Sequence, residues 1–323
     1  MSLIGKKLIL FCTGLSCVIM VNAQQMPIYS QYGMYNPAVA GADGFTTFNL
    51  TSRDEWIGFD NSPKTNVISI QGRILRSNSK VKDSPLFKRK RVSKNSGRVG
   101  LGLHIFNDRN GAISRTGAQL TYAYHIFMNN KQLSFGLAAS TFQFKIAEDK
   151  LEFREQEPLL NDAFSNKVLV PDVTFGVQLL NPNSYCGLSV ANLFQSQIKI
   201  GSEKNYDYRL YRHYFLMAGK SFNENNTFSY EPSILLRGTE KMIFQADLQM
   251  RVYYNRDYYL GLCYRTGSAI GTMIGLKWDR FYFSYVFDYN LTPLQQHTFG
   301  SHEINLAYKI GDSARRYRWL IRY

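Results

Sequence analysis

The feature that most constrains the fold is an alternation of apolar and polar residues, which restarts about fourteen times between Phe45 and Ile310. Successive side chains of a strand point to opposite faces, so each such stretch offers one face to hydrocarbon and one to water. A chain built from many of these stretches is expected to be all-β. In the stretch Met242–Tyr253, the apolar face carries Met242, Phe244, Ala246, Leu248, Met250 and Val252, and the polar face carries Gln245, Asp247, Gln249 and Arg251.

The N-terminus has the pattern of a secretory signal. Residues 1–23 place two lysines before an apolar run from Leu8 to Val21 and end on Ala23. The run is too short for a confident membrane-spanning helix. We therefore expect a signal peptide over 1–23 and a mature chain that begins at Gln24. A lipoprotein start at Cys17 is disfavoured because apolar residues follow it.

Composition then indicates how the exported chain could sit in a membrane. No later stretch is long and apolar enough for a spanning helix, and only helices and closed sheets satisfy their backbone in lipid. The chain is 45% hydrophobic and 15% aromatic, and Tyr and Trp are favoured where a barrel wall meets lipid headgroups. We predict an all-β fold, a transmembrane antiparallel β-barrel of outer-membrane type with about 14 strands, over residues 45–311.

The connections between the expected strands alternate between short and long. Outer-membrane barrels have short periplasmic turns and longer outer loops, so this parity predicts that both ends of the chain lie on the periplasmic side. The short links are 129–130, 181–183, 223–226, 255–256 and 279–280, and the long ones are 147–170, 195–205 and 290–301. The expected strands are Phe45–Glu55, Thr65–Leu75, Gly97–Asn107, Ser114–Met128, Gln132–Lys145, Asp172–Leu180, Ser184–Phe194, Tyr206–Phe222, Thr227–Arg237, Lys241–Tyr254, Asp257–Tyr264, Ile270–Trp278, Phe281–Tyr289 and His302–Ile310.

One connection, Arg76–Arg98, breaks this alternation of short and long links. It is long, although counting the strands from the first one places it on the periplasmic side. It contains a basic run of Lys88, Arg89, Lys90 and Arg91. Two interpretations stay open: a solvated flexible loop, or a docking segment for an acidic periplasmic partner or the anionic leaflet. The formal charge of +14 would also suit nucleic acid, but an exported chain does not meet it, so no nucleic-acid partner is expected.

The two ends of the mature chain flank the barrel. Residues 24–44 contain Tyr29, Tyr32 and Tyr35 and do not resemble a free polar tail. They are expected either to tuck into or beneath the barrel as a plug or to form an ordered periplasmic extension. After the last strand, 312–323 is expected to be a basic periplasmic tail, although a closing strand at Trp319–Tyr323 is the alternative.

A barrel of about fourteen strands should enclose a lumen that needs water, a plug or a ligand. Alternation points several polar side chains into it, and we expect them to pair with one another or to coat a water path rather than to act in catalysis. These inward residues are Asp247, Gln249, Arg251, Glu303, Asn305 and Lys309.

The sequence offers no catalytic constellation. The nearest nucleophile and base are Ser301 and His302, but adjacent strand residues point to opposite faces. The remaining cysteines of the mature chain, Cys186 and Cys263, have neither metal-site nor disulfide-scaffold spacing. We expect no enzyme activity, no cofactor and no metal.

Several motifs resemble the PorP/SprF family of outer-membrane proteins, which belongs to the type IX secretion system of Bacteroidetes. Their order along nearly all of the mature chain is more specific than any one of them. They are Tyr29–Tyr32, Asn36–Gly41, the pattern of Arg53, Trp56, Gly58, Pro63 and Thr65, then Gly187–Leu193, Glu231–Ser233, Tyr285–Asp288 and Ser301–Leu306.

The resemblance implies a non-enzymatic barrel in the outer membrane that binds a secreted surface protein with a type IX C-terminal domain, commonly an adhesin, or other secretion components. It would thereby support export or surface attachment. Candidate partner-binding residues are Lys88, Arg89, Lys90 and Arg91, with Arg53 and Trp56. For the last two, a lumen charge near a strand end and an interface aromatic are the alternative. The rival function is a porin-like or hydrophobic-solute channel.

Overall fold

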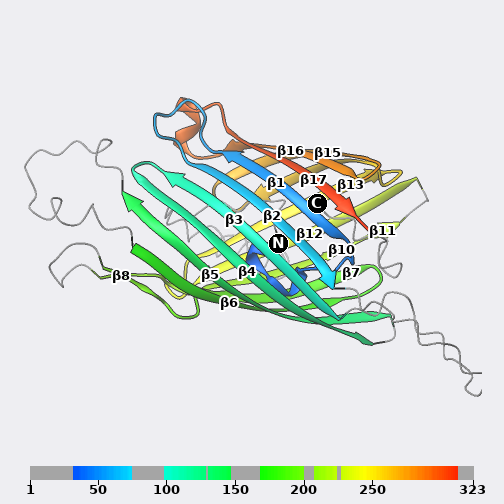
Figure 1. The fold of residues 1–323 in the computed structure, drawn as a ribbon. Helices are drawn as coiled ribbons and strands as arrows, with labels where there is room; N and C mark the ends of the chain where they lie inside the picture. The colour runs from blue at the N-terminus through cyan, green and yellow to red at the C-terminus, as the bar shows by residue number, and fades with distance from the viewer. Residues whose placement is uncertain are drawn as a thin grey trace, which may run out of the picture.

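The computed structural model describes residues 32–74, 98–128, 130–146, 168–199, 207–223 and 227–311. These residues form a closed antiparallel barrel of 14 strands (Figure 1). The predicted fold class is therefore confirmed. Among these residues, no helix is long and apolar enough to cross a membrane.

Each barrel strand pairs with the next barrel strand along the chain, and β1 closes the ring against β17, from Thr46 opposite Ile310 to Asp54 opposite His302. Short β11 (Phe222–Asn223) follows β10 and pairs with the same neighbour, β12. The barrel strands are β1 Thr46–Asp54, β2 Lys64–Ile74, β3 Val99–Asn110, β4 Ile113–Met128, β5 Lys131–Ile146, β6 Val168–Leu180, β7 Ser184–Ala191, β10 His213–Lys220, β12 Phe228–Thr239, β13 Phe244–Tyr254, β14 Tyr258–Arg265, β15 Ala269–Trp278, β16 Phe281–Asn290 and β17 Ser301–Ile310.

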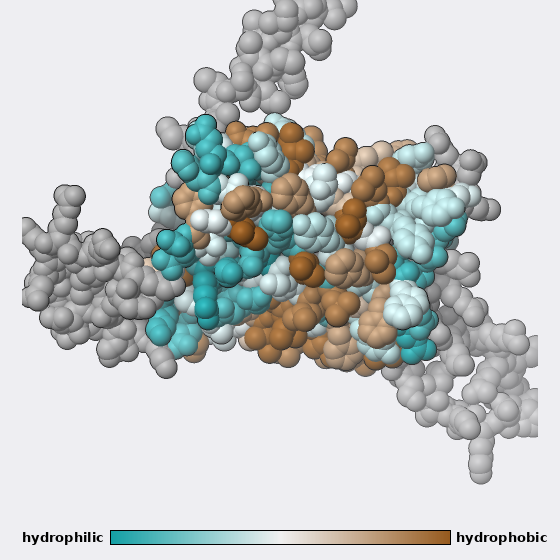
Figure 2. Space-filling view, turned by 90° about the horizontal axis from the view of Figure 1, so that it is seen from above, coloured by the Kyte–Doolittle hydropathy of each residue, from teal (hydrophilic) through white to brown (hydrophobic). Residues whose placement is uncertain are grey.

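The alternation in sequence becomes an alternation between lumen and lipid. Along β14, Leu260 and Leu262 point outward and are 62% and 60% exposed, whereas Cys263 is 2% exposed. In water, so many exposed apolar side chains would drive aggregation, but on a barrel wall they face lipid. Figure 2 shows this apolar surface along one side of the barrel, bordered by hydrophilic residues. All six predicted inward residues are buried, namely Asp247, Gln249, Arg251, Glu303, Asn305 and Lys309.

Most expected strand boundaries differ from the structure by one to four residues, and three expected strands were wrong because they ran into a turn or loop. Tyr206–Phe222 is not one strand, because β9 (Asp207–Arg209) pairs with β8 (Gln197–Lys199) in a separate hairpin and β10 begins only at His213. The seventh strand stops at Ala191, since Asn192 turns the chain with a φ of 58°. The tenth expected strand starts too early, because Met242 has a φ of 59° and its N–H bonds to Thr239 in a turn.

The two ends of the barrel differ. The links between β4 and β5, β6 and β7, β13 and β14, and β15 and β16 are all short and lie at the same end as the start of β1 and the end of β17. The opposite end has the long loops 55–63 and 291–300 together with short turns such as 111–112. The end whose links are mostly short is the one that faces the periplasm in such barrels. We call this the periplasmic end and the opposite one the outer end. The ends of β2 and β3 that flank the basic connection, Ile74 and Val99, pair at the periplasmic end. The basic run itself, the signal region 1–23 and the tail 312–323 lie outside the described residues.

Candidate functional site: a filled lumen and the outer loops

Residues 32–44, which we call the lumenal segment, lie inside the ring of strands (blue in Figure 1). The segment contains α2 (Tyr32–Tyr35) and the 3-10 turn η1 (Pro37–Val39). Asn36 joins the two: its backbone N–H donates to the Tyr32 carbonyl at 3.0 Å, and its side-chain oxygen accepts from the Ala38 N–H at 3.0 Å. Pro37 follows this cap in the position where a helical turn needs no N–H.

Inward-facing glycines form the surface on which the lumenal segment rests. A Cβ on Gly100 would lie 2.0 Å from the Ala40 oxygen, and one on Gly136 would lie 2.1 Å from the Ala38 nitrogen. One on Gly176 would lie 2.1 Å from the Asn36 side-chain oxygen. Contacts this short are repulsive, so these positions need glycine for the backbone to approach the wall. The groove and the segment are therefore fitted to each other.

Polar side chains of the wall bind the carbonyls of the lumenal segment. Arg73 donates from Nε to the Gly41 oxygen at 2.9 Å and from Nη2 to the Ala42 oxygen at 2.8 Å. His125 Nε2 lies 3.0 Å from the Ala40 oxygen, and its Nδ1 lies 2.8 Å from Ser134 Oγ. A carbonyl can only accept, so His125 must carry its proton on Nε2. These bonds satisfy acceptors that would otherwise be buried without partners.

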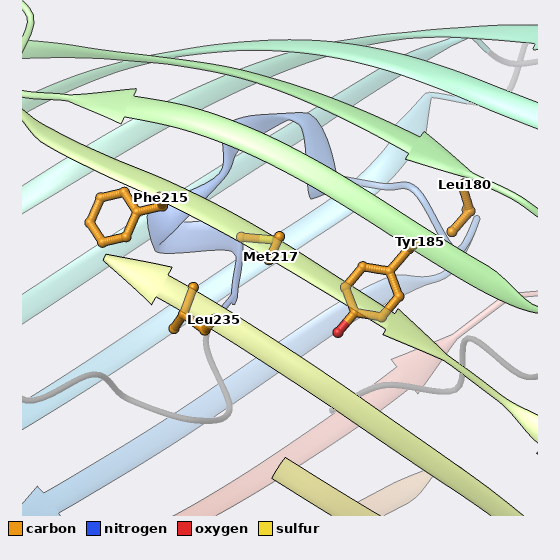
Figure 3. Close-up of a cluster of buried hydrophobic side chains, with 5 residues drawn as sticks. All are labelled: Leu180, Tyr185, Phe215, Met217 and Leu235. Atoms are coloured by element: carbon orange, nitrogen blue, oxygen red, sulfur yellow. The ribbon is translucent and has the colours of Figure 1, made fainter. Parts of the chain in front are cut away.

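The far side of the lumenal segment reaches other strands. The Tyr32 hydroxyl lies 3.2 Å from the Gln249 side-chain oxygen on β13, to which it donates. An apolar cluster on the lumen wall packs against the segment, and the Tyr35 and Phe215 ring centroids are 5.2 Å apart. Figure 3 shows the cluster, which consists of Leu180, Tyr185, Phe215, Met217 and Leu235. The segment thus contacts opposing parts of the wall.

Near the outer end, the lumen contains what we call the outer charge network. Arg53 is 1% exposed and binds three carboxylates, at 2.9 Å to Glu55, 2.6 Å to Asp288 and 3.2 Å to Glu303. Arg265 continues the network, at 2.9 Å from Asp247 and 3.9 Å from Asp288. Arg237 adds a contact of 3.7 Å to Asp247. Such buried charges are stable only when paired in this way.

The outer charge network has four carboxyl groups against three guanidinium groups. The network thus has one carboxyl group more than it has guanidinium groups. Glu55, which lies one residue beyond β1, is one of these four carboxyl groups. Burial raises the pKa of the Glu55 carboxyl above its usual value, and the charge of Arg53 opposes that rise without cancelling it.

Two outer loops meet above this network. The loop 55–63, between β1 and β2, and the loop 291–300, between β16 and β17, exchange backbone hydrogen bonds. The Ile57 N–H donates to the Gly300 oxygen at 2.9 Å, and the Phe299 N–H donates to the Ile57 oxygen at 2.7 Å. The Trp56 N–H donates to Ser301 Oγ at 3.2 Å. The loops therefore form one surface.

The candidate residues from the sequence fall in different places. Arg53 points into the lumen and is held in the outer charge network, whereas Trp56 lies in the first outer loop, partly buried and with a φ of 51°. Lys88 to Arg91 lie outside the described residues. Arg73, Gly100 and His125 contact the lumenal segment but were not predicted to do so. The strand alternation places all three positions on the lumen face and could have indicated this role.

The described residues contain no group of three or more His, Cys, Asp or Glu side chains that could hold a metal ion. Cys186 is exposed, whereas Cys263 is buried.

Comparison with protein families gives one match, to the type IX secretion system membrane protein PorP/SprF, over residues 21–308. The chain belongs to the PorP/SprF family. This membership and the barrel fold together place it in the outer membrane, as predicted. Comparison with curated proteins gives no match.

Solved structures similar to this PorP/SprF member are outer-membrane barrels. The toluene transporter TbuX of Ralstonia pickettii has a TM-score of 0.50 at 11% identity, over 87% of this chain and 93% of that one. The toluene transporter TodX of Pseudomonas putida has a TM-score of 0.45 at 9% identity, over 89% and 94%. At such identities, the TbuX likeness shows the fold alone.

Proposed function

We propose that this barrel supports type IX export or surface attachment of a secreted surface protein by binding it. Its partners would be such a protein, through its type IX C-terminal domain, and other secretion components in the periplasm and outer membrane. The observation that carries the proposal is the filled lumen. The lumenal segment is bound on several strands, and its Asn36, Ala38 and Ala40 are 0% exposed.

A conducting barrel of this size needs a continuous aqueous path. Here the lumenal segment and the outer charge network occupy the lumen at two levels, near the periplasmic and outer ends respectively. Opening both levels would break buried ion pairs and hydrogen bonds, each of which costs about 1–5 kcal/mol to break. Solute passage is therefore the less favoured function. We expect the loops and the two ends of the barrel to bind the partner proteins.

We further propose the segmentation that the sequence indicates: a signal peptide over 1–23, a plug-like segment over 24–44 and a basic tail over 312–323. The contacts of residues 32–44 with Arg73 and His125 support the second of these. Lys88 to Arg91 remain our candidates for a periplasmic partner. Neutralising all four should weaken a salt-sensitive interaction there.

The test is deletion of the whole chain from its host, followed by quantitative proteomics of the cell surface and the medium. Loss of one surface protein, with other secreted proteins unchanged, would support a dedicated binding role. A general secretion defect would support a role in the core machinery. An unchanged secreted proteome, together with solute-selective conductance of the purified barrel in planar bilayers, would overturn the proposal in favour of a channel.

A further inference from the structure

The outer end has a cleft between the first outer loop and the β3–β4 turn. Its volume is about 440 Å³, enough for one or two large side chains. Its lining includes Asp54, Ile57, Phe59, Asp60, Lys64 and Arg109.

The walls of the cleft are held in place before any partner arrives. Asn61 accepts a hydrogen bond through its carbonyl from the Gly111 N–H at 3.2 Å, which ties the first outer loop to the β3–β4 turn. Trp56 and Asn61 have φ values of 51° and 58°, a left-handed conformation that costs a non-glycine residue about 1 kcal/mol. A loop that retains such strain is fixed by its surroundings, and a fixed loop binds with a smaller entropic cost.

The apolar surface continues from the cleft onto the second outer loop. Phe59 is 41% and Phe299 is 76% exposed, and the Phe59 ring lies edge-on to His297 with centroids 6.4 Å apart. A Cβ on Gly58 would lie 3.2 Å from the Phe299 ring, so the loops touch here. Exposed aromatic side chains on a rigid support are typical anchors of protein interfaces.

Charges of both signs surround this apolar surface. Asp54 and Lys64 pair with each other at 3.4 Å, whereas Asp60 and Arg109 make no ion pair in the part of the chain that the structure describes. Both side chains are exposed at the cleft. An occupant that fits would bring a cation to Asp60 and an anion to Arg109.

We propose that this cleft docks an extended segment of the secreted surface protein, which inserts an apolar side chain against Ile57 and Phe59. A basic residue of that segment faces Asp60 and an acidic one faces Arg109. The inference rests on the proposed function and names the surface that carries it. A lipid occupant is disfavoured, because the lipid-facing residues of this barrel lie along the strands, and an acyl chain offers no cation for Asp60.

The test uses the full-length barrel in its host, with a photo-crosslinking phenylalanine analogue in place of Phe59. A matched control carries the analogue at Met242, which is 74% exposed in the outer β12–β13 turn, away from the cleft. We expect a crosslink from position 59 to one secreted surface protein, at least several-fold above that from position 242. Asp60→Lys together with Arg109→Glu should reduce this crosslink on the order of tenfold. Heat-modifiable migration of the barrel on gels confirms folding of each variant.

A crosslink from position 59 to lipid alone, or one equal to that from position 242, would overturn the inference. So would retention of a protein crosslink after the double charge reversal. Surface proteomics separates this failure from failure of the proposed function. If whole-chain deletion removes a surface protein that Phe59→Ser with Phe299→Ser retains in full, the binding role stands and only this cleft is wrong.

Discussion

Arg53 and Asp288 lie 235 positions apart in the chain, yet Arg53 Nη2 and Asp288 Oδ2 are 2.6 Å apart inside the barrel. Closure of the ring by β1 and β17 brings them together, since β16 and β1 flank β17 on its two sides. The same guanidinium also binds Glu55, at the base of the first outer loop. One buried residue therefore ties β1 to β16, to β17 and to the base of the first outer loop.

Replacing Arg53 should be among the most damaging single changes to the barrel. Arg53→Leu leaves three carboxyl groups without their shared partner, and removing one member of a buried ion pair costs about 3–5 kcal/mol. The matched control is Lys64→Ala, which breaks the 3.4 Å pair with Asp54 in which the lysine side chain is 54% exposed. That change should cost at most about 1 kcal/mol. Urea unfolding of the detergent-solubilised barrel measures both, and equal midpoints would contradict the assignment.

Glu55 should make stability depend on pH. Burial raises the pKa of its folded-state carboxyl above 4.5, so the folded protein binds this proton more tightly than the unfolded one. The resulting stabilisation is complete below about pH 4.5 and is lost as pH rises through the folded-state pKa. Glu55→Gln removes this dependence and keeps an oxygen that accepts from Arg53. The free energy of unfolding of Glu55→Gln relative to the parent should thus increase with pH in that window.

The measurement compares urea unfolding of both proteins from about pH 4 to 8. Asp279→Asn, which removes an exposed carboxyl in the β15–β16 turn, is the control for general charge effects. Parallel curves for parent and Glu55→Gln, or a difference that shrinks as pH rises, would refute the account.

Arg73 should hold the lumenal segment at its C-terminal side. Arg73→Leu removes both hydrogen bonds to Gly41 and Ala42 and leaves two buried carbonyls without them, at a cost of about 1–3 kcal/mol each. Amide hydrogen exchange of the peptide spanning 36–44, followed by mass spectrometry, should be faster in this variant. Arg280→Leu, in an exposed periplasmic turn, serves as the control. Unchanged exchange in Arg73→Leu would show that the segment is held elsewhere.

The fold was predictable because alternation is a local signal, repeated in every strand. It correctly pointed Asp247 and Glu303 into the lumen. It did not reveal which charges pair, because Arg53 meets Asp288 only through ring closure and the register of β1, β17 and β16. The position of the lumenal segment was likewise open, since glycines such as Gly100 read only as weak strand residues until the backbone they face is known. Met242 misled because its apolar character fits a strand whereas its φ belongs to a turn.

Two glycines of β3 allow the sharpest test of the filled lumen. Gly100 and Gly102 both face inward, but a Cβ on Gly100 would lie 2.0 Å from the Ala40 oxygen, whereas one on Gly102 would have its nearest contact at 3.4 Å. Gly100→Ala should therefore push the lumenal segment from its groove at a cost of about 1–3 kcal/mol, and Gly102→Ala should leave it in place.

The readout is labelling of a Val39→Cys thiol by a water-soluble maleimide, with Cys186 and Cys263 replaced by Ser. Val39 is partly buried, so the parent should react slowly. A displacement energy of 1–3 kcal/mol predicts roughly 5- to 150-fold faster labelling in Gly100→Ala, and single-channel conductance in planar bilayers should rise with it if the segment acts as a plug.

Equal labelling of the two alanine variants would mean that the segment does not depend on the groove. Faster labelling without any rise in conductance would instead assign the seal to the outer charge network, because that second level would still be closed.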